Sequence, residues 1–205
     1  MTGSAAASPA AGDSWAATLD AYRDGVRVLQ RLGSKFVDWS LPTGHAGWSA
    51  VTLAGHLLCT ARRHHRLLDA ALAGQPVGGL PAGADLLALH EAEVASLGVT
   101  AGADRVVAFD AVATRYAERL AEVDPRLVVG SWRWGGPLDV ATHAREAAAG
   151  WHLHAWDLAD ALGWDYRPAR PADLLASGDE GGDPWDRLLR GSGRRPPPEP
   201  RPAGP

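Results

Sequence analysis

Residues 150–163 read GWHLHAWDLADALG, and their spacing decides the fold. At about 100° per residue of an α-helix, the apolar residues around His154 fall on one stripe. His154 lies near the centre of this stripe, whereas His152 and Trp156 lie on the opposite side. The spacing therefore predicts a helix whose buried face carries His154 and whose exposed face carries His152.

Three further helical segments precede this one in the chain. Residues 14–32 have apolar side chains at helical spacing. Ser49 can act as the N-cap of a helix that extends to about Leu72. Residues 85–123 are helical in pattern but are interrupted by LGVTAGAD, so one bent helix and two short helices both remain open. Together with the last helix, these segments predict an all-α protein built as a bundle of four main helices.

The two ends of the chain lack the pattern of a packed domain. Residues 1–13 have neither the basic region nor the apolar core of a signal peptide, and we expect them to form a disordered leader. Beyond residue 166, Gly, Pro, Asp and Arg dominate, and such a segment buries too little apolar surface to offset the entropy of ordering. We therefore expect the bundle in residues 14–166 and a mostly disordered Pro/Gly-rich tail in residues 167–205, in which Trp185 can dock locally.

The composition limits the classes of function. The formal net charge is -4, which does not favour nucleic acid as a partner. The sequence contains no run of about 18 apolar residues, so we expect no membrane-spanning helix. The single cysteine, Cys59, cannot form an internal disulfide, which agrees with a cytoplasmic protein. The expected partner is a small-molecule substrate or ligand, and a homodimer remains open.

The segment after Ser49 carries two further histidines that can reach the core. Its apolar side is defined by Leu57 and Leu68, and His64 lies close to the centre of that side. His56 lies about 100° away from this centre, at the edge of the apolar stripe. A buried histidine is most simply a core residue that is hydrogen-bonded to a carbonyl or an acid, and a metal ligand is the alternative. Periodicity alone favours His64 as the inward residue.

Two motifs resemble a known family. WSLPTGHAGWSAVTLAGHLL (residues 39–58) looks like the loop and metal-site helix of the mycothiol-dependent maleylpyruvate isomerase N-terminal domain, a family of the DinB-like superfamily. THAREAAAGWHLHAWDLADALG (residues 142–163) is similar to the last helix of that family. The resemblance implies a DinB-like four-helix bundle with one divalent metal, usually zinc. It also implies mycothiol or another low-molecular-weight thiol as cofactor.

The resemblance places two metal ligands, His56 and His154, and the same two residues are the expected catalytic groups. The third ligand of the family is a glutamate one turn before the last histidine, and this position is Gly150, which has no side chain to ligate a metal. Ala46 replaces the proline of the family's loop motif. Two of the three protein ligands that the resemblance implies are therefore present.

Tryptophans near the last helix are the expected contacts of a cofactor. Trp132 and Trp134 lie in the loop just before this helix, and Trp151 lies about 60° from the direction of His154. Three functions remain open: a thiol-dependent isomerase or transferase acting through His56 and His154, a metal-free ligand-binding or regulatory module, and a metal-free acid–base catalyst. The sequence leaves open whether the protein is an enzyme, and it names no substrate.

Overall fold

The computed structural model describes five stretches of the chain: residues 11–45, 47–75, 85–130, 137–175 and 182–194. Four long helices form the bundle: α1 (Ala11–Gly33), α2 (Ala50–Leu72), α4 (Gly102–Leu120) and α5 (Val140–Ala161). The predicted all-α bundle is thus confirmed. Because α1 begins at Ala11, residues 11–13 belong to this helix, and residues 1–10 of the expected leader lie outside the described residues.

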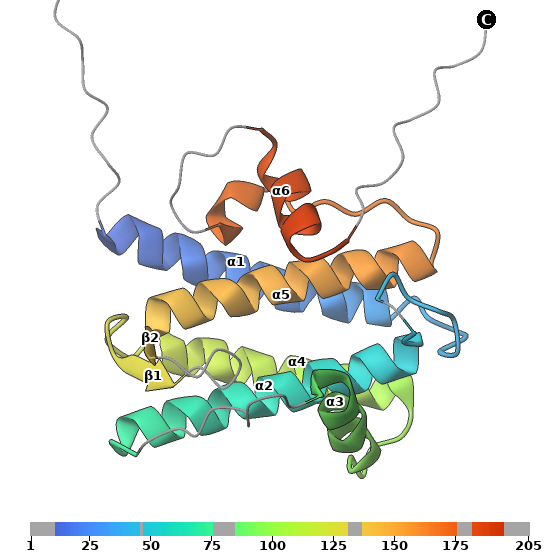
Figure 1. Ribbon diagram of the computed structural model, residues 1–205, viewed down its shortest axis with the longest axis horizontal. Helices are drawn as coiled ribbons and strands as arrows, with labels where there is room; N and C mark the ends of the chain where they lie inside the picture. The colour runs from blue at the N-terminus through green and yellow to red at the C-terminus, as the bar shows by residue number, and fades with distance from the viewer. Residues whose placement is uncertain (1–10, 46, 76–84, 131–136, 176–181, 195–205) are drawn as a thin grey trace, which may run out of the picture.

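The bundle has two layers of helices (Figure 1). One layer pairs α1 with α5, the other pairs α2 with α4, and α1 also contacts α4. The first pair packs closely because Gly25 of α1 has no side chain: a Cβ there would lie 2.7 Å from the Cβ of Trp151 on α5. No helix in the described part of the chain is long and apolar enough to span a membrane.

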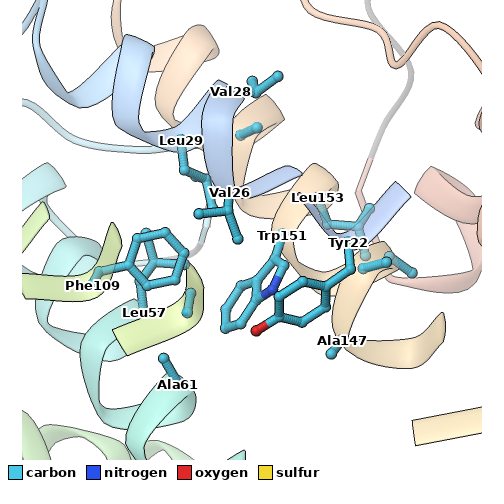
Figure 2. Packing of buried hydrophobic residues seen from close by; sticks show 14 of the residues in the cluster. Tyr22, Val26, Val28, Leu29, Leu57, Ala61, Phe109, Ala147, Trp151 and Leu153 are labelled. Carbon is cyan, nitrogen blue, oxygen red and sulfur yellow. The ribbon is translucent and has the colours of Figure 1, made fainter. Parts of the chain in front are cut away.

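Aromatic side chains fill the centre of the bundle (Figure 2). The ring of Trp151 lies edge-on to Tyr22 and to Phe109, with centroid separations of 6.0 Å and 5.1 Å. All three side chains are buried, and rings of this size contribute a large share of the apolar surface removed from water. Trp151 is therefore a core residue between α1 and α4. The expectation that Trp151 contacts a cofactor stays a prediction.

The interrupted third segment forms two helices rather than one bent helix. The first is α3 (Leu86–Ala95), which Asp85 caps with its side chain, and the second is α4. Figure 1 shows α3 packed against α2 near the beginning of that helix. The buried Arg63 of α2 forms an ion pair with Glu93 of α3 and holds the short helix in place.

A short hairpin precedes α5. Its antiparallel strands are β1 (Val128–Gly130) and β2 (Pro137–Asp139), at the end of the bundle where α5 begins (Figure 1). The N-cap of α5 is Asp139, which accepts a hydrogen bond from the backbone N–H of Thr142 at 2.7 Å. Trp132 and Trp134 belong to residues 131–136, which lie outside the described residues.

The chain after α5 is more structured than its composition predicts. A 3₁₀-helix, η1 (Pro171–Leu174), contacts α1 and α5, and α6 (Pro184–Gly191) packs on η1 (Figure 1). Trp185 and Leu189 of α6 are only 2% and 0% exposed. The local docking that the sequence allowed for Trp185 is thus present, and the expectation for the tail as a whole stays a prediction. A few large apolar residues at helical spacing bury enough surface to order this segment despite the many Gly and Pro residues.

Candidate functional site

Four imidazoles gather at the end of the bundle where α2 begins and α5 ends. The ring centroids of His56 on α2 and His154 on α5 are 5.2 Å apart. The ring of His90 on α3 lies 4.4 Å from that of His56, and the ring of His45, from the loop before α2, lies 5.9 Å from that of His154. The structure thus brings the two predicted histidines together and adds two that the sequence patterns did not single out. We call these four residues the histidine cluster.

The loop before α2 forms one wall of the cluster. The backbone N–H of Thr43 donates to the carbonyl of Trp48 at 2.9 Å, so the loop closes into a compact turn. This turn places the buried indole of Trp48 against His45 and His56, with ring centroids 4.5 Å and 4.9 Å apart. Trp48 therefore shields one side of the cluster from solvent.

His56 is a buried member of the cluster and is 8% exposed. Its Nε2 lies 3.4 Å from the hydroxyl of Thr60, and its buried Nδ1 has no hydrogen-bond partner among the described residues. Burial, and then the charge that His154 and His90 carry when protonated, lower the pKa of His56 well below its ordinary value. The ring is therefore neutral at pH 7, which is the form that binds a metal or accepts a proton.

A hydrogen bond to a buried carboxylate orients His154. Its Nδ1 lies 3.0 Å from Oδ2 of the fully buried Asp157. Arg194 donates to the same carboxylate from Nε at 2.8 Å and from Nη2 at 2.6 Å. Burial by itself would raise the pKa of Asp157, but the hydrogen bonds from Arg194 and His154 outweigh it and lower the pKa to about 2. The ionised carboxylate holds the proton of a neutral His154 on Nδ1, which leaves Nε2 available as a ligand or base.

The sequence patterns did not identify His45, His90 or Arg194 as site residues, and only one of the three lies in a recognised motif. His45 lies inside the loop motif that suggested the family, so its place just before the helix of His56 was a usable signal. His90 lies in a segment without a recognised motif, and Arg194 lies in a Pro/Arg-rich stretch typical of solvated tails. Only contacts between distant segments bring these two residues to the site.

His152 is buried, contrary to the prediction that it faces solvent. It is 2% exposed, its Nε2 lies 3.1 Å from the carbonyl oxygen of Ala21, and its Nδ1 lies 2.5 Å from the hydroxyl of Tyr166. The prediction failed because α1 and the segment after α5 cover this face of the helix as well. His154 is 13% exposed and faces α2, so the inward direction predicted for it is correct. Both ring nitrogens of His152 have partners, as expected of a structural histidine.

A second pair of histidines lies deeper in the bundle. His64 and His143 are both buried, and their ring centroids are 4.8 Å apart. The Nδ1 of His143 lies 3.2 Å from the hydroxyl of Tyr116. Burial lowers the pKa of His143 to about 4 and the pKa of His64 well below its ordinary value. Both rings are therefore neutral parts of the core, and the inward direction predicted for His64 is confirmed.

The donor set of the cluster fits a divalent metal in part. Neutral imidazoles are ligands that zinc accepts readily, and the unpartnered Nδ1 of His56 is such a donor. However, no group of three or more His, Cys, Asp or Glu side chains in the described residues is already placed to hold a metal ion. Gly150 explains part of this result, because glycine has no side chain that could bind a metal. A Cβ at this position would meet nothing within 4 Å. The position is open but supplies no ligand.

A groove of about 440 Å³ opens beside the cluster. Trp48 lines this groove as well as the cluster, and Glu91 and Arg105 provide charged groups of opposite sign along its wall. His56 and His154 do not line the groove, so the expected pocket around them is not part of it. Trp48 thus lies between the cluster and the groove.

The sequence profile of the mycothiol maleylpyruvate isomerase N-terminal domain matches residues 19–159. The chain belongs to this family. His56 and His154 lie within the matched residues, whereas α6 and Arg194 lie beyond them. The resemblance carried by the two sequence motifs is thus confirmed. No curated protein and no solved structure matches the chain.

Proposed function

We propose that the protein binds a divalent metal, zinc, at His56 and His154, and that it catalyses a thiol-dependent transfer or isomerisation of a small molecule. The observation that carries this proposal is the 5.2 Å separation of the two ring centroids. Two imidazoles on one tetrahedral ion, with Zn–N bonds of about 2.0–2.1 Å, have ring centroids roughly 5 Å apart. The two side chains come from the helices on which the family resemblance places its ligands.

When bound, the metal supplies positive charge that keeps a thiol in its thiolate form near neutral pH. The chain's own residues prepare the site for this chemistry. Asp157 holds the proton of His154 on Nδ1 and so directs Nε2 as the donor atom. Trp48 limits the access of water to His56. Mycothiol, which the family name indicates, or a similar low-molecular-weight thiol is the proposed cofactor.

The pair formed by His154 and Asp157 supports a second candidate function, acid–base catalysis without a metal. An imidazole whose Nδ1 donates to an ionised carboxylate is a better base at Nε2, because the carboxylate stabilises the imidazolium that forms. The missing side chain at Gly150 favours this alternative, since it removes one of the ligands that the family resemblance implies. A ligand-binding module without turnover would use the same residues.

Metal analysis of the full chain, purified without chelators, tests the proposal. We expect about one zinc ion per chain, and zinc at about 100 times its Kd should stabilise the fold by roughly 2.7 kcal/mol. His56→Ala and His154→Ala should each abolish the rise in Tm on zinc addition. His65→Ala, on the same helix as His56 but outside the cluster, should keep it. A wild-type protein that contains no metal and shows no zinc-dependent change in Tm would place the metal-free functions first.

A further inference from the structure

We propose that the groove beside the histidine cluster binds a small organic monocarboxylate with an apolar body, and that the carboxylate pairs with Arg105. The groove has a volume of about 440 Å³, within the range of about 300–1,000 Å³ that is common for small-molecule sites. The inference does not depend on a metal at His56 and His154, because neither of these residues lines the groove.

Arg105, near the beginning of α4, is the feature that selects a negative charge. Its side chain lines the groove, although the residue is only 7% exposed. Its Nε donates to the carbonyl of Val99 at 2.9 Å, and its Nη1 donates to the carbonyl of Val51 at 2.8 Å. Its Nη2 has no hydrogen-bond partner among the described residues. One end of the guanidinium is therefore available to a molecule in the groove.

The charge of this guanidinium has no acidic partner in the part of the chain that the structure describes. Both of its hydrogen-bond partners are neutral backbone carbonyls, whereas the equally buried Arg63 pairs with Glu93. Arginine keeps its proton in proteins, and a buried charge is normally paired because its removal from water costs free energy. A carboxylate in the groove supplies the missing partner through a charge-assisted hydrogen bond.

The position of Arg105 depends on Gly55 of α2. A Cβ at residue 55 would lie 3.0 Å from Nη1 of Arg105 and 2.7 Å from Cγ1 of Val94 on α3. The glycine thus lets the guanidinium and α3 approach α2 together. This packing, with the two bonds to carbonyls, holds the guanidinium in place before a ligand arrives, which lowers the entropy cost of binding.

The rest of the lining favours an apolar body over a second negative charge. Val94, Leu97 and the indole of Trp48 line the groove, and all three side chains are buried. Glu91 is an exposed acidic residue of the same lining, and its charge repels a second carboxylate. The groove therefore fits a monocarboxylate better than a dicarboxylate.

An NMR titration of the isotope-labelled full chain, treated with a chelator, tests the proposal with benzoate as the probe. We expect saturable changes in the backbone signals of Val94 and Leu97 and in the Nε–H signal of Arg105. Benzamide has nearly the same shape without the charge, and it should bind at least about tenfold more weakly, because a hydrogen bond between two charged groups is lost. Acetate, which lacks the apolar body, should also bind at least about tenfold more weakly.

Terephthalate tests the preference for a single negative charge, because it adds a second carboxylate to the shape of benzoate. It should bind more weakly than benzoate, and Glu91→Gln should reduce this difference. Tighter binding of terephthalate than of benzoate would contradict the preference for a monocarboxylate.

Two pairs of variants test the groove itself. Arg105→Gln should lower the affinity for benzoate to about that for benzamide, whereas Arg115→Gln, at an exposed position of the same helix, should leave it unchanged. Circular dichroism and Tm show whether the Arg105 variant is folded, since Arg105 also holds two backbone carbonyls. Ala95 lines the groove from an exposed position, so Ala95→Phe should fill the groove and weaken benzoate binding with the arginine intact. Ala92→Phe, at an exposed position of α3 outside the lining, is its control.

The outcomes decide each part of the proposal. Equal affinities of the wild type for benzoate and benzamide, or a folded Arg105→Gln variant that binds benzoate as the wild type does, would overturn the role of Arg105. Signal changes elsewhere in the chain, or unchanged binding by Ala95→Phe, would exclude the groove. Acetate binding as tight as that of benzoate would exclude the apolar body, and a wild type that does not bind benzoate would refute the whole proposal. Because the titration is made without metal, this inference and the proposed function can fail separately.

Discussion

Replacing Arg194 by glutamine tests how firmly the end of the described chain is tied to the histidine cluster. Arg194 donates two hydrogen bonds to Asp157, whose side chain is fully buried. The variant leaves this carboxylate with the hydrogen bond to His154 Nδ1 and without its guanidinium partner. Removing one partner of a buried ion pair typically costs about 3–5 kcal/mol, because the other charge stays buried without compensation.

The pKa of Asp157 gives a second measure of the same effect. Burial raises this pKa, but the hydrogen bonds from Arg194 and His154 lower it from 3.8 to about 2. The unfolded chain therefore binds this proton first as the pH falls, so the stabilisation is fully present above about pH 4 and is lost toward pH 2. At about 1.4 kcal/mol per pH unit, the difference corresponds to roughly 2–3 kcal/mol. We expect Arg194→Gln to lower the free energy of unfolding at pH 7 by about 2–4 kcal/mol.

Urea denaturation of the metal-free protein at pH 7 measures this loss. The matched control is Arg190→Gln in the last turn of α6, an exposed position where a surface change should stay within about 0.5 kcal/mol. Adding Asp157→Asn to Arg194→Gln should recover part of the lost stability, because no unpaired charge then remains buried. Equal unfolding free energies for the Arg194 and Arg190 variants would refute the reasoning.

Two further predictions concern the core. Gly25→Ala should lower the free energy of unfolding by about 1–3 kcal/mol, since its Cβ would lie 2.7 Å from the Cβ of Trp151. Gly150→Ala, where nothing lies within 4 Å of the new Cβ, should raise the free energy of unfolding by up to about 1 kcal/mol. If both glycine variants changed the free energy of unfolding in the same direction, the close packing of α1 on α5 would be contradicted. Burial lowers the pKa of His143 from 6.5 to about 4, so the histidine of the unfolded chain is protonated first as the pH falls. Roughly 3 kcal/mol of stability should therefore be lost between about pH 6.5 and pH 4. Unfolding of His143→Phe should depend less on pH across this range, and parallel pH profiles for the two proteins would exclude the effect.

The helices with clear local signals were determined by the sequence. Ser49 is the N-cap of α2, as predicted, because capping depends on one side chain and the backbone just after it. The apolar spacing in residues 14–32 likewise lies within α1. The meeting of His56 and His154 also followed from the sequence, since both residues lie in motifs of consecutive residues and the structure brings their rings together.

The surroundings of each helix were decided only by the tertiary structure. Periodicity identifies one buried stripe of a helix, but it does not tell how many other segments pack against that helix. In α5, the side that carries His152 is buried as well. Composition predicted a disordered tail, whereas Trp185 and Leu189 bury enough surface to order α6. A few large buried side chains can order a segment whose average composition predicts disorder. The composition of the segment does not show which side chains become buried.

Contacts between residues far apart in the chain were likewise decided only by the tertiary structure. Arg194 reaches Asp157 across 37 residues, and His90 reaches His56 because Val94 docks against Gly55. Neither contact leaves a pattern in the local sequence, because each depends on how two separate helices meet. The sequence by itself therefore determined the helices and two of the histidines. The packing of α3 and of the C-terminal segment decided which other side chains surround those two histidines.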